Sequence, residues 1–302
     1  MSAVSTGVDA LAAEFQQHRS HLLGVGYRLT GSWADAEDAV QESWLRLQRT
    51  GREEVHDLRG WLTVVVGRLC LDRLRSAAAR RERYVGPWLP EPLVTSLDEP
   101  ADDVVRDEGV RMAALVVLER LTPDQRIAFV LHDAFGVPFD EIAAVLGCSV
   151  SAARQHASRG RRSVADADPP PRAALSEQRR VLEALTTALA AADLDAVVAL
   201  LHPDAVLLGD GGGKERTARR PVAGAEKVAR FLLGLLERYG ADQLTAAGPV
   251  LVNGDLGLLI PASPGDADHP TPIARRVSGF AVRDGRISTI YDIVNPDKLT
   301  RL

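Results

Sequence analysis

The chain is poor in cysteine: it has only Cys70 and Cys148, which lie far apart in sequence. Two such isolated thiols exclude a disulfide scaffold and a cysteine-ligated zinc site, and they are typical of a reducing compartment. The chain also lacks an apolar run that approaches the roughly 18 residues of a membrane-spanning helix, and its N-terminus lacks the basic segment of a signal peptide. These absences predict a cytoplasmic protein that has no membrane segment and uses no metal or cofactor.

An excess of basic residues is also missing, because residues 1–167 carry 20 arginines against 24 acidic residues. Bulk electrostatics therefore do not indicate a nucleic-acid partner. The basic residues are nevertheless clustered, with six arginines in residues 68–83 and four, without any acidic residue, in residues 150–164. Seven acidic residues occupy the stretch 91–108 between the clusters. The pattern is that of two basic segments joined by an acidic linker.

The length of the chain and its residue patterning indicate several domains. Its 302 residues and 46% hydrophobic content indicate two or three folded domains. Residues 8–84 and 108–165 have helical periodicity, whereas residues 85–107 contain four prolines and are predicted to form an acidic extended linker. Residues 173–302 mix helical segments with strand-like runs and contain an Asp-Gly hairpin signal at 284–285. The sequence predicts a multidomain fold, with two all-α domains followed by an α+β domain that has a curved antiparallel sheet.

Residues 139–160 have the pattern of a helix-turn-helix. Gly147 suits a left-handed turn between the two helices, and Ser149 is placed to cap the second helix. The second helix of such a motif enters the major groove of DNA, where arginine and glutamine can make bidentate contacts with bases. An ordinary helical hairpin with a solvated arginine face is the alternative. The residues predicted to contact DNA are Ser149, Ser151, Arg154, Gln155, Ser158, Arg159, Arg161 and Arg162.

Two helices of the first domain carry further polar clusters. Residues 29–49 predict an acidic amphipathic helix, which on its own is usually a solvated surface helix. Residues 59–84 predict a basic helix whose apolar face contains Trp61, Val64, Val65 and Leu69. A tryptophan at the start of a basic helix can stack on an unpaired base while the arginines contact phosphates, although a solvated surface helix explains the pattern equally well. The polar face of this second helix consists of Arg68, Asp72, Arg73 and Arg75.

Taken in order, these segments resemble a bacterial RNA polymerase sigma factor of the extracytoplasmic-function type. The resemblance rests on the acidic helix, the pattern W-L-x-x-V-V-x-R-x-x-L-D-x-L-R, the proline-rich acidic linker and the stretch from LTPDQR through the helix-turn-helix. It implies that residues 8–84 are sigma region 2 and that residues 108–165 are sigma region 4, which binds the −35 promoter element. It implies core-polymerase contacts by Asp35, Asp38, Gln41, Glu42 and Trp44. It also implies contacts with the −10 element by Trp61, Arg68, Asp72, Arg73 and Arg75.

Three further motifs are similar to those of the SigJ-type subgroup, whose members carry a fused SnoaL-like domain. The subgroup implies a cone-shaped α+β domain for residues 173–302. The motifs are WLPEP (Trp88, Leu89, Pro90, Glu91, Pro92), DGGGK (Asp210, Gly211, Gly212, Gly213, Lys214) and NPDKL (Asn295, Pro296, Asp297, Lys298, Leu299). WLPEP is stiffened by its prolines, and DGGGK lacks the spacing of a P-loop. The simplest hypothesis is that all three lie near one another at a shared interface; an ordinary linker with a buried tryptophan is the alternative for WLPEP.

The sequence therefore predicts a sigma factor that directs promoter-specific transcription initiation, with core RNA polymerase and promoter DNA as partners. The resemblance implies that the SnoaL-like domain regulates the sigma part in cis, so that a separate anti-sigma protein is not required. The alternative is a one-component DNA-binding regulator whose SnoaL-like pocket senses a small ligand. Catalysis is not expected, because no spacing brings together the acid–base candidates His202, Asp210, His269 and Asp292.

Overall fold

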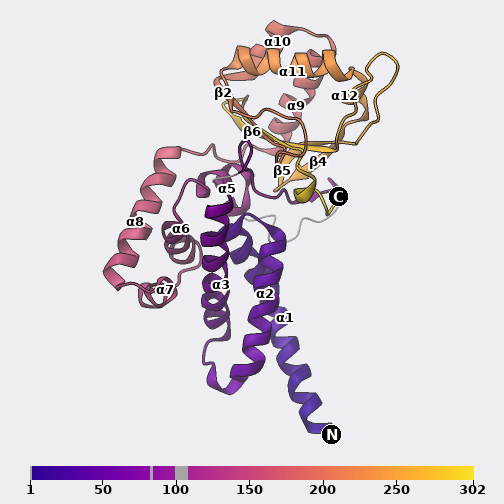
Figure 1. Ribbon diagram of the computed structural model, residues 1–302. Coiled ribbons are helices and arrows are strands. Elements are labelled where there is room, and N and C mark those ends of the chain that lie inside the picture. The colour runs from indigo at the N-terminus through magenta and orange to yellow at the C-terminus, as the bar shows by residue number, and fades with distance from the viewer. Residues whose placement is uncertain (1, 82–83, 99–107) are drawn as a thin grey trace. The chain divides into compact units, whose positions relative to one another are not determined.

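Helices make up the first part of the chain and a sheet dominates the last part (Figure 1), in a computed structural model that describes residues 2–81, 84–98 and 108–302. Among the described residues, 2–81, 108–110 and 114–169 form one folded unit. The second unit is formed by 84–98, 111–113 and 170–302. The described part of the predicted linker therefore belongs to the second unit, and the remainder, 99–107, lies outside the described residues.

Three helices form the first half of the first unit: α1 (Ser2–Thr30), α2 (Trp33–Thr50) and α3 (Leu58–Arg81), with a short 3-10 turn η1 (Arg52–Glu54) before α3. Ser32 starts α2 because its side chain accepts a hydrogen bond from the backbone N–H of Asp35 at 3.2 Å. Gly26 lets α1 approach α2, since an added Cβ would lie 2.9 Å from the Cβ of Ala36. The buried face of α3 contains Leu62, Val66 and Cys70.

The second half of the first unit contains η2 (Glu108–Val110), α5 (Met112–Leu118), α6 (Pro123–Phe129), the π-helical turn η3 (Val130–Ala134), α7 (Phe139–Leu146) and α8 (Val150–Ala167). The side chains of Thr122 and Gln125 form a capping box at the start of α6. This half packs directly against α3, because a Cβ on Gly67 would lie 2.9 Å from a methyl group of Leu131. The two predicted helical domains thus share one folded unit.

The second unit is built on a seven-stranded sheet with the order β1-β4-β5-β6-β7-β2-β3. The strands are β1 (Val94–Thr95), β2 (Leu201–Asp210), β3 (Val222–Ala223), β4 (Gly248–Val252), β5 (Asp255–Ile260), β6 (Arg276–Arg283) and β7 (Arg286–Ile293). The predicted Asp-Gly hairpin is confirmed: Asp284 and Gly285 have φ of 52° and 71° and join β6 to β7. Neighbouring strands are antiparallel except β2 and β7, a parallel pairing that the sequence analysis did not foresee.

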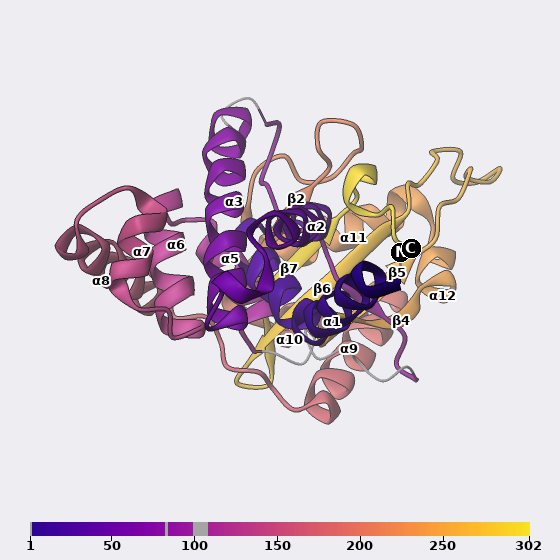
Figure 2. The same cartoon turned by 90° about the horizontal axis from the view of Figure 1, so that it is seen from below.

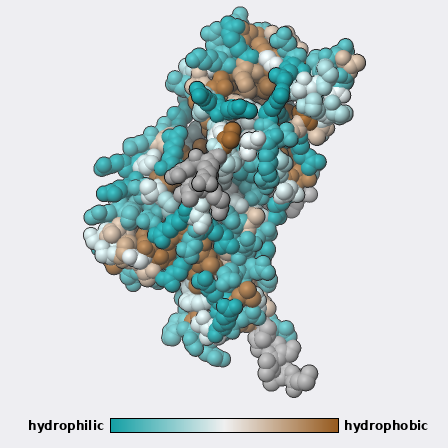
Figure 3. Space-filling view, in the orientation of Figure 1, coloured by the Kyte–Doolittle hydropathy of each residue, from teal (hydrophilic) through white to brown (hydrophobic). Residues whose placement is uncertain are grey.

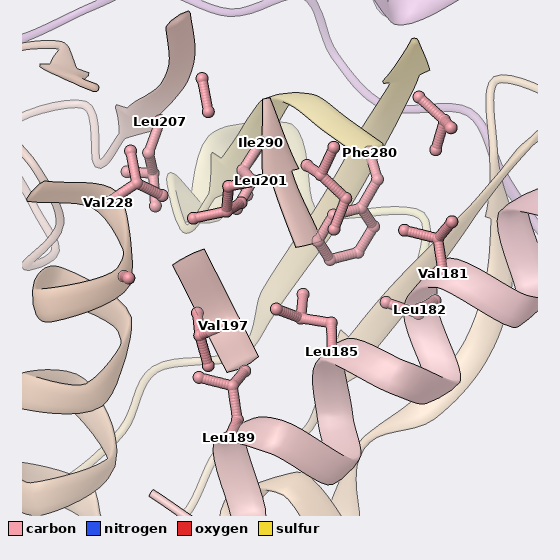
Figure 4. Packing of buried hydrophobic residues seen from close by; sticks show 14 of the residues in the cluster. Val181, Leu182, Leu185, Leu189, Val197, Leu201, Leu207, Val228, Phe280 and Ile290 are labelled. Carbon is pink, nitrogen blue, oxygen red and sulfur yellow. The ribbon is translucent and has the colours of Figure 1, made fainter. Parts of the chain in front are cut away.

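Helices cover one face of this sheet (Figures 1 and 2): α9 (Leu175–Ala190), α10 (Leu194–Leu200), α11 (Ala225–Tyr239) and α12 (Asp242–Ala246). The core between the layers is mostly aliphatic, and Figure 4 shows Leu185 of α9 beside the ring of Phe280 from β6. A 3-10 turn, η4 (Pro296–Lys298), follows β7. The predicted α+β architecture is confirmed. Among the described residues, no helix is long and apolar enough to cross a membrane.

Candidate nucleic-acid interface and linker clasp

The helix-turn-helix of the first unit forms as the sequence predicts. Gly147 adopts φ of 68° between α7 and α8, and the Ser149 side chain accepts a hydrogen bond from the N–H of Ala152 at 3.2 Å. On the inner side of α8, Ala153 and Ala157 are buried, and a Cβ on Gly160 would lie 2.8 Å from the Cβ of Phe129. Because these residues are small, α8 packs closely against α6, and the opposite face of α8 is left exposed to solvent.

The outward face of α8 is hydrophilic, as the surface over this helix in Figure 3 shows. All eight residues predicted to contact DNA are exposed: Ser149, Ser151, Arg154, Gln155, Ser158, Arg159, Arg161 and Arg162. The guanidinium of Arg154 lies 5.6 Å from the ring centre of Phe139, and Arg161 Nε contacts Asp133 Oδ1 at 2.5 Å. No acidic residue occurs in residues 150–164, so the positive charge of this face is not offset within that part of the helix.

A second surface lies between α1 and α2. The ring centres of Phe15 and Trp44 are 5.1 Å apart, and these side chains line a shallow groove together with Asp38 and Gln41. Asp38 and Gln41 are exposed, and Trp44 is half-buried. The lining of the groove thus combines two aromatic rings with acidic and amide groups and with Arg19. It contains three of the five residues that the resemblance assigns to core-polymerase binding; Asp35 and Glu42 lie on the same helix, half-buried.

On α3, the side chains of Trp61, Val64 and Val65 do not belong to the buried core. They are half-exposed and line a groove with Arg46, Arg49, Thr50 and Arg68. Of the predicted apolar face only Leu69 is buried, because α3 is apolar on more than one side and helical periodicity alone does not identify the side that packs. A groove with an aromatic ring and three arginines is suited to a base and its phosphate.

The three predicted −10 arginines already make contacts inside the first unit. Arg68 Nη2 donates to the backbone oxygen of Ala144 at 2.8 Å, and Arg75 Nη2 donates to Asp124 Oδ1 at 3.1 Å. Arg73 lies 3.5 Å from Asp35 Oδ1 and 3.6 Å from Asp38 Oδ2. Asp72 is exposed. These arginines bind residues of both halves of the unit.

A buried carboxylate organises the second unit. Asp210, at the end of β2, has 0% of its surface exposed. Its oxygens accept hydrogen bonds from the Tyr84 hydroxyl at 2.5 Å, the Leu89 N–H at 2.8 Å and the Gly212 N–H at 3.1 Å. The ammonium of Lys298 lies 2.7 Å from Asp210 Oδ2. Burial and the Asp210 carboxylate raise the pKa of Tyr84, so its hydroxyl stays a donor.

Lys298 completes this arrangement from the C-terminal side. Its Nζ lies 3.8 Å from the ring centre of Trp88, as in a cation–π interaction, and it donates to the Leu89 carbonyl. Asn295 Nδ2 donates to the Tyr84 hydroxyl at 2.8 Å. We call Tyr84, Trp88, Leu89, Asp210, Asn295 and Lys298 the clasp. The expectation that WLPEP, DGGGK and NPDKL lie near one another is confirmed, since the clasp contains residues of all three motifs.

The linker is also held beyond the clasp. Leu93 and Asn253 exchange two hydrogen bonds, of 3.1 and 2.8 Å, and β1 continues the chain as an antiparallel neighbour of β4. Leu89, Glu91 and Leu93 are buried. On the far side of the linker, Arg111 Nε donates to Asp255 Oδ2 at 2.9 Å in a buried ion pair. The second unit therefore holds residues on both sides of the predicted linker.

Two family models match the chain: "Sigma-70 region 2" over residues 15–80 and "Sigma-70, region 4" over residues 111–164. The ECF RNA polymerase sigma factor SigJ of Mycobacterium tuberculosis is 52% identical over 296 residues, which cover 95% of this chain and 93% of that protein. The chain belongs to the extracytoplasmic-function RNA polymerase sigma factors. A probable sigma factor of this type, SigI of the same species, is 34% identical over 97% of the chain and 96% of its own length. The crystal structure of M. tuberculosis SigJ matches with a TM-score of 0.82, over 96% of this chain and 98% of that one.

As a sigma factor, the chain serves promoter-specific transcription initiation. The two family matches fall on α1–α3 and on α5–α8. The acid–base candidates of the second unit are not paired with one another. His202 Nδ1 accepts from the Asp204 N–H, His269 contacts Asp266, and Asp292 contacts Thr217 and Arg276.

Several clasp and linker contacts were missed by the sequence analysis. Tyr84 lies four residues before WLPEP, and no local pattern links it to Asp210. Asn253 precedes Gly254 in a tight turn, with φ of 55°, and this Asn-Gly pair predicts a hairpin turn but not that its amide binds the linker. Arg111 and Asp255 are 144 residues apart, so only the folded chain brings them together.

Proposed function

We propose that this sigma factor is regulated in cis by its SnoaL-like C-terminal domain, which holds the segment between sigma regions 2 and 4. The observation that carries the proposal is the clasp: one fully buried carboxylate, Asp210, binds three parts of the chain at once. On this proposal the partners are core RNA polymerase and promoter DNA, in the cytoplasm, where the polymerase works. A separate anti-sigma protein is not required, and the chain is not an enzyme.

Core polymerase is proposed to bind at α2 and the groove beside it. Asp38 and Gln41 are exposed there, and the ring of Trp44 offers apolar area next to them. Charged and amide groups around an aromatic residue are typical of a protein interface whose apolar centre is ringed by polar contacts. Asp35 and Glu42 extend the acidic surface along the same helix.

Promoter DNA is proposed to bind at α8 and α3. The exposed arginines and Gln155 of α8 support −35 recognition, because these side chains reach both phosphates and base edges. The groove around Trp61 supports capture of an unpaired base at the −10 element. Arg68, Arg73 and Arg75 would then exchange their present partners for phosphate groups. The ion pairs of Arg73 and Arg75 contribute only about 0–1 kcal/mol each, and the hydrogen bond of Arg68 to a backbone oxygen about 0.5–1.5 kcal/mol, so this exchange is energetically accessible.

Regulation is proposed to work through the position of the linker. Residues 84–98 lie between sigma regions 2 and 4 in the sequence, so this segment limits how far apart the two regions can move. The clasp fixes the segment to the rest of the second unit. Leu93 with Asn253 and Arg111 with Asp255 add further attachment points. Release of the clasp therefore loosens the linker, which comes free when these further contacts also break, whereas an intact clasp restrains the sigma regions.

Run-off transcription with core RNA polymerase tests the proposal on the full chain. Asp210→Asn keeps the size of the side chain but removes the charge that pairs with Lys298, and we expect it to raise promoter output or shift the start site. A truncation after Val294, which removes NPDKL, should act in the same direction. Asp297→Asn is the matched control, because Asp297 pairs with Lys214 at the surface. Equal output and start sites from all four proteins would contradict regulation by the clasp.

A further inference from the structure

Phe139 is an aromatic residue at the surface of the helix-turn-helix rather than in its core. It begins α7, is half-exposed, and lies against side chains from two other elements. The ring of His132, in the π-helical turn η3, stacks on it with ring centres 3.9 Å apart and planes inclined by 28°. The guanidinium of Arg154, near the start of α8, lies over it at 5.6 Å from the ring centre. One ring thus connects η3, α7 and α8.

The turn before α7 fixes His132 beneath this ring. Gly136 adopts φ of 68°, a left-handed conformation that favours glycine, and its N–H donates to the His132 carbonyl at 3.0 Å. Val137 is buried, and its carbonyl accepts a hydrogen bond from His132 Nδ1 at 3.1 Å. His132 is therefore held through its backbone and through its side chain. The ring of Phe139 packs on a side chain that is itself fixed.

The exposed arginines of α8 are held in different ways. Arg161 Nε donates to Asp133 Oδ1, so a carboxylate balances its charge and occupies one of its donors. Arg159 and Arg162 have neither an ion pair nor an aromatic contact among the residues that the structure describes. Arg154 is held by a ring alone, and its guanidinium makes no hydrogen bond in the described part of the chain. A cation–π contact restricts the guanidinium and leaves all five of its N–H donors available.

A guanidinium that is ordered before binding meets a base edge at a lower cost. An arginine side chain has many rotamers, and it loses this freedom when it makes a bidentate contact with a guanine. The face of an aromatic ring attracts the planar cation and reduces the number of rotamers that it samples in the free protein. Contacts with phosphates do not require one fixed orientation and carry no sequence information. Ordering Arg154 therefore improves the discrimination between bases more than it improves affinity for DNA in general.

We propose that Phe139 is a positioning residue for −35 recognition, because its ring orders the guanidinium of Arg154 for contact with a base edge. Phe139 itself does not contact DNA in this arrangement, and it determines how strongly Arg154 discriminates between bases. The inference rests on the proposed binding of the −35 element by α8, and it adds a residue that determines specificity there.

Binding of the full chain with core RNA polymerase tests the proposal. The probe is DNA that this holoenzyme selects from a pool randomised over the −35 region, compared with the same DNA carrying single-base changes there. Phe139→Leu keeps an apolar side chain and removes the ring. We expect it to lower the preference for the selected DNA about two- to fivefold, which corresponds to about 0.5–1 kcal/mol. Affinity for DNA of unrelated sequence should not change, because phosphate contacts supply it.

Phe135→Leu is the matched control. Phe135 follows η3 directly, and the guanidinium of Arg28, in α1, lies 4.9 Å from its ring centre. The variant removes an aromatic ring and a cation–π contact of the same unit, but not one that α8 makes, so it should keep the preference. Phe139→Tyr retains the aromatic face and should keep the preference as well. A loss in either variant as large as that in Phe139→Leu would overturn the proposal.

A double-mutant cycle separates positioning from a general effect on the fold. In an Arg154→Ala background, Phe139→Leu should cause no further loss of preference, since the ring then has no guanidinium to order. Equal losses from Phe139→Leu with and without Arg154, or an unchanged preference in Phe139→Leu, would overturn the proposal and leave −35 binding by α8 standing. An unchanged preference in Arg154→Ala would overturn the −35 assignment of Arg154 and the positioning role together.

Discussion

Lys298 and Lys214 each form an ion pair with an aspartate of the second unit. The clasp predicts that the two pairs contribute very different amounts to stability. Lys298 is 11% exposed and faces a carboxylate that is fully buried, whereas Lys214 and its partner Asp297 are 54% and 64% exposed. Both ion pairs have the same N–O distance of 2.7 Å. Replacing each lysine by methionine keeps the apolar stem and removes the charge, so the comparison isolates the effect of burial.

Lys298→Met leaves the Asp210 carboxylate buried without a counter-charge. Removing one partner of a buried ion pair costs about 3–5 kcal/mol, and the donors that remain from Tyr84, Leu89 and Gly212 place the expected loss near 3 kcal/mol. The exposed pair of Lys214 contributes about 0–1 kcal/mol. At about 1.4 kcal/mol per factor of ten, the clasp should open roughly 100-fold more often in Lys298→Met and at most about fivefold more often in Lys214→Met.

Native-state hydrogen exchange of the Leu89 N–H measures this difference, because that proton is bonded to Asp210 and exchanges when the clasp opens. A double variant, Lys298→Met with Asp210→Asn, removes both charges and should recover part of the protection. Similar exchange rates of the Leu89 N–H in Lys298→Met and Lys214→Met would refute the reasoning that burial makes the Lys298–Asp210 pair the more stabilising one.

Three further predictions concern the first unit. Burial raises the pKa of the Cys70 thiol to about 12, so iodoacetamide at neutral pH should modify the half-buried Cys148 and leave Cys70 intact until the protein unfolds; early alkylation of Cys70 would contradict this. Burial, with Arg59 nearby, lowers the pKa of His21 to about 4, while the unfolded chain has a value of about 6.5, so the unfolded state takes up a proton first as pH falls. The contribution of neutral His21 to the free energy of unfolding should therefore be fully present above about pH 6.5 and be lost progressively between about pH 6.5 and 4. The midpoint of thermal unfolding should fall less across that window in His21→Gln. Arg154→Ala should weaken −35 selectivity by about 1–3 kcal/mol if its contact is bidentate, with unchanged selectivity in binding assays as the contrary result.

Much of the fold follows from local signals. The Asp-Gly turn at 284–285, Gly147 in its left-handed conformation and Ser149 as a cap are each determined by a few neighbouring residues, so the sequence predicts them. The meeting of three short motifs was predicted from a resemblance, and the reason for it, the single carboxylate of Asp210, emerges only from the folded chain.

Long-range and ambiguous features were not predictable. The parallel pairing of β2 with β7 joins strands separated by some 80 residues, and no local pattern encodes it. Strand β1 has only two residues inside a proline-rich segment, and it exists because β4 offers free hydrogen-bonding groups. Helix α3 is apolar on several sides, so which side faces the core was decided by packing, with Leu62 and Val66 inward and Val64 outward.

The pairing of β1 with β4 has a consequence for self-association. Val94 and Thr95 occupy the outer edge of β4 opposite Val252 and Leu251, and an open sheet edge is a template for strands of other molecules. A molecule whose linker has left the sheet bares this edge. On the proposed regulation, the freed form is therefore the one prone to dimerise or aggregate.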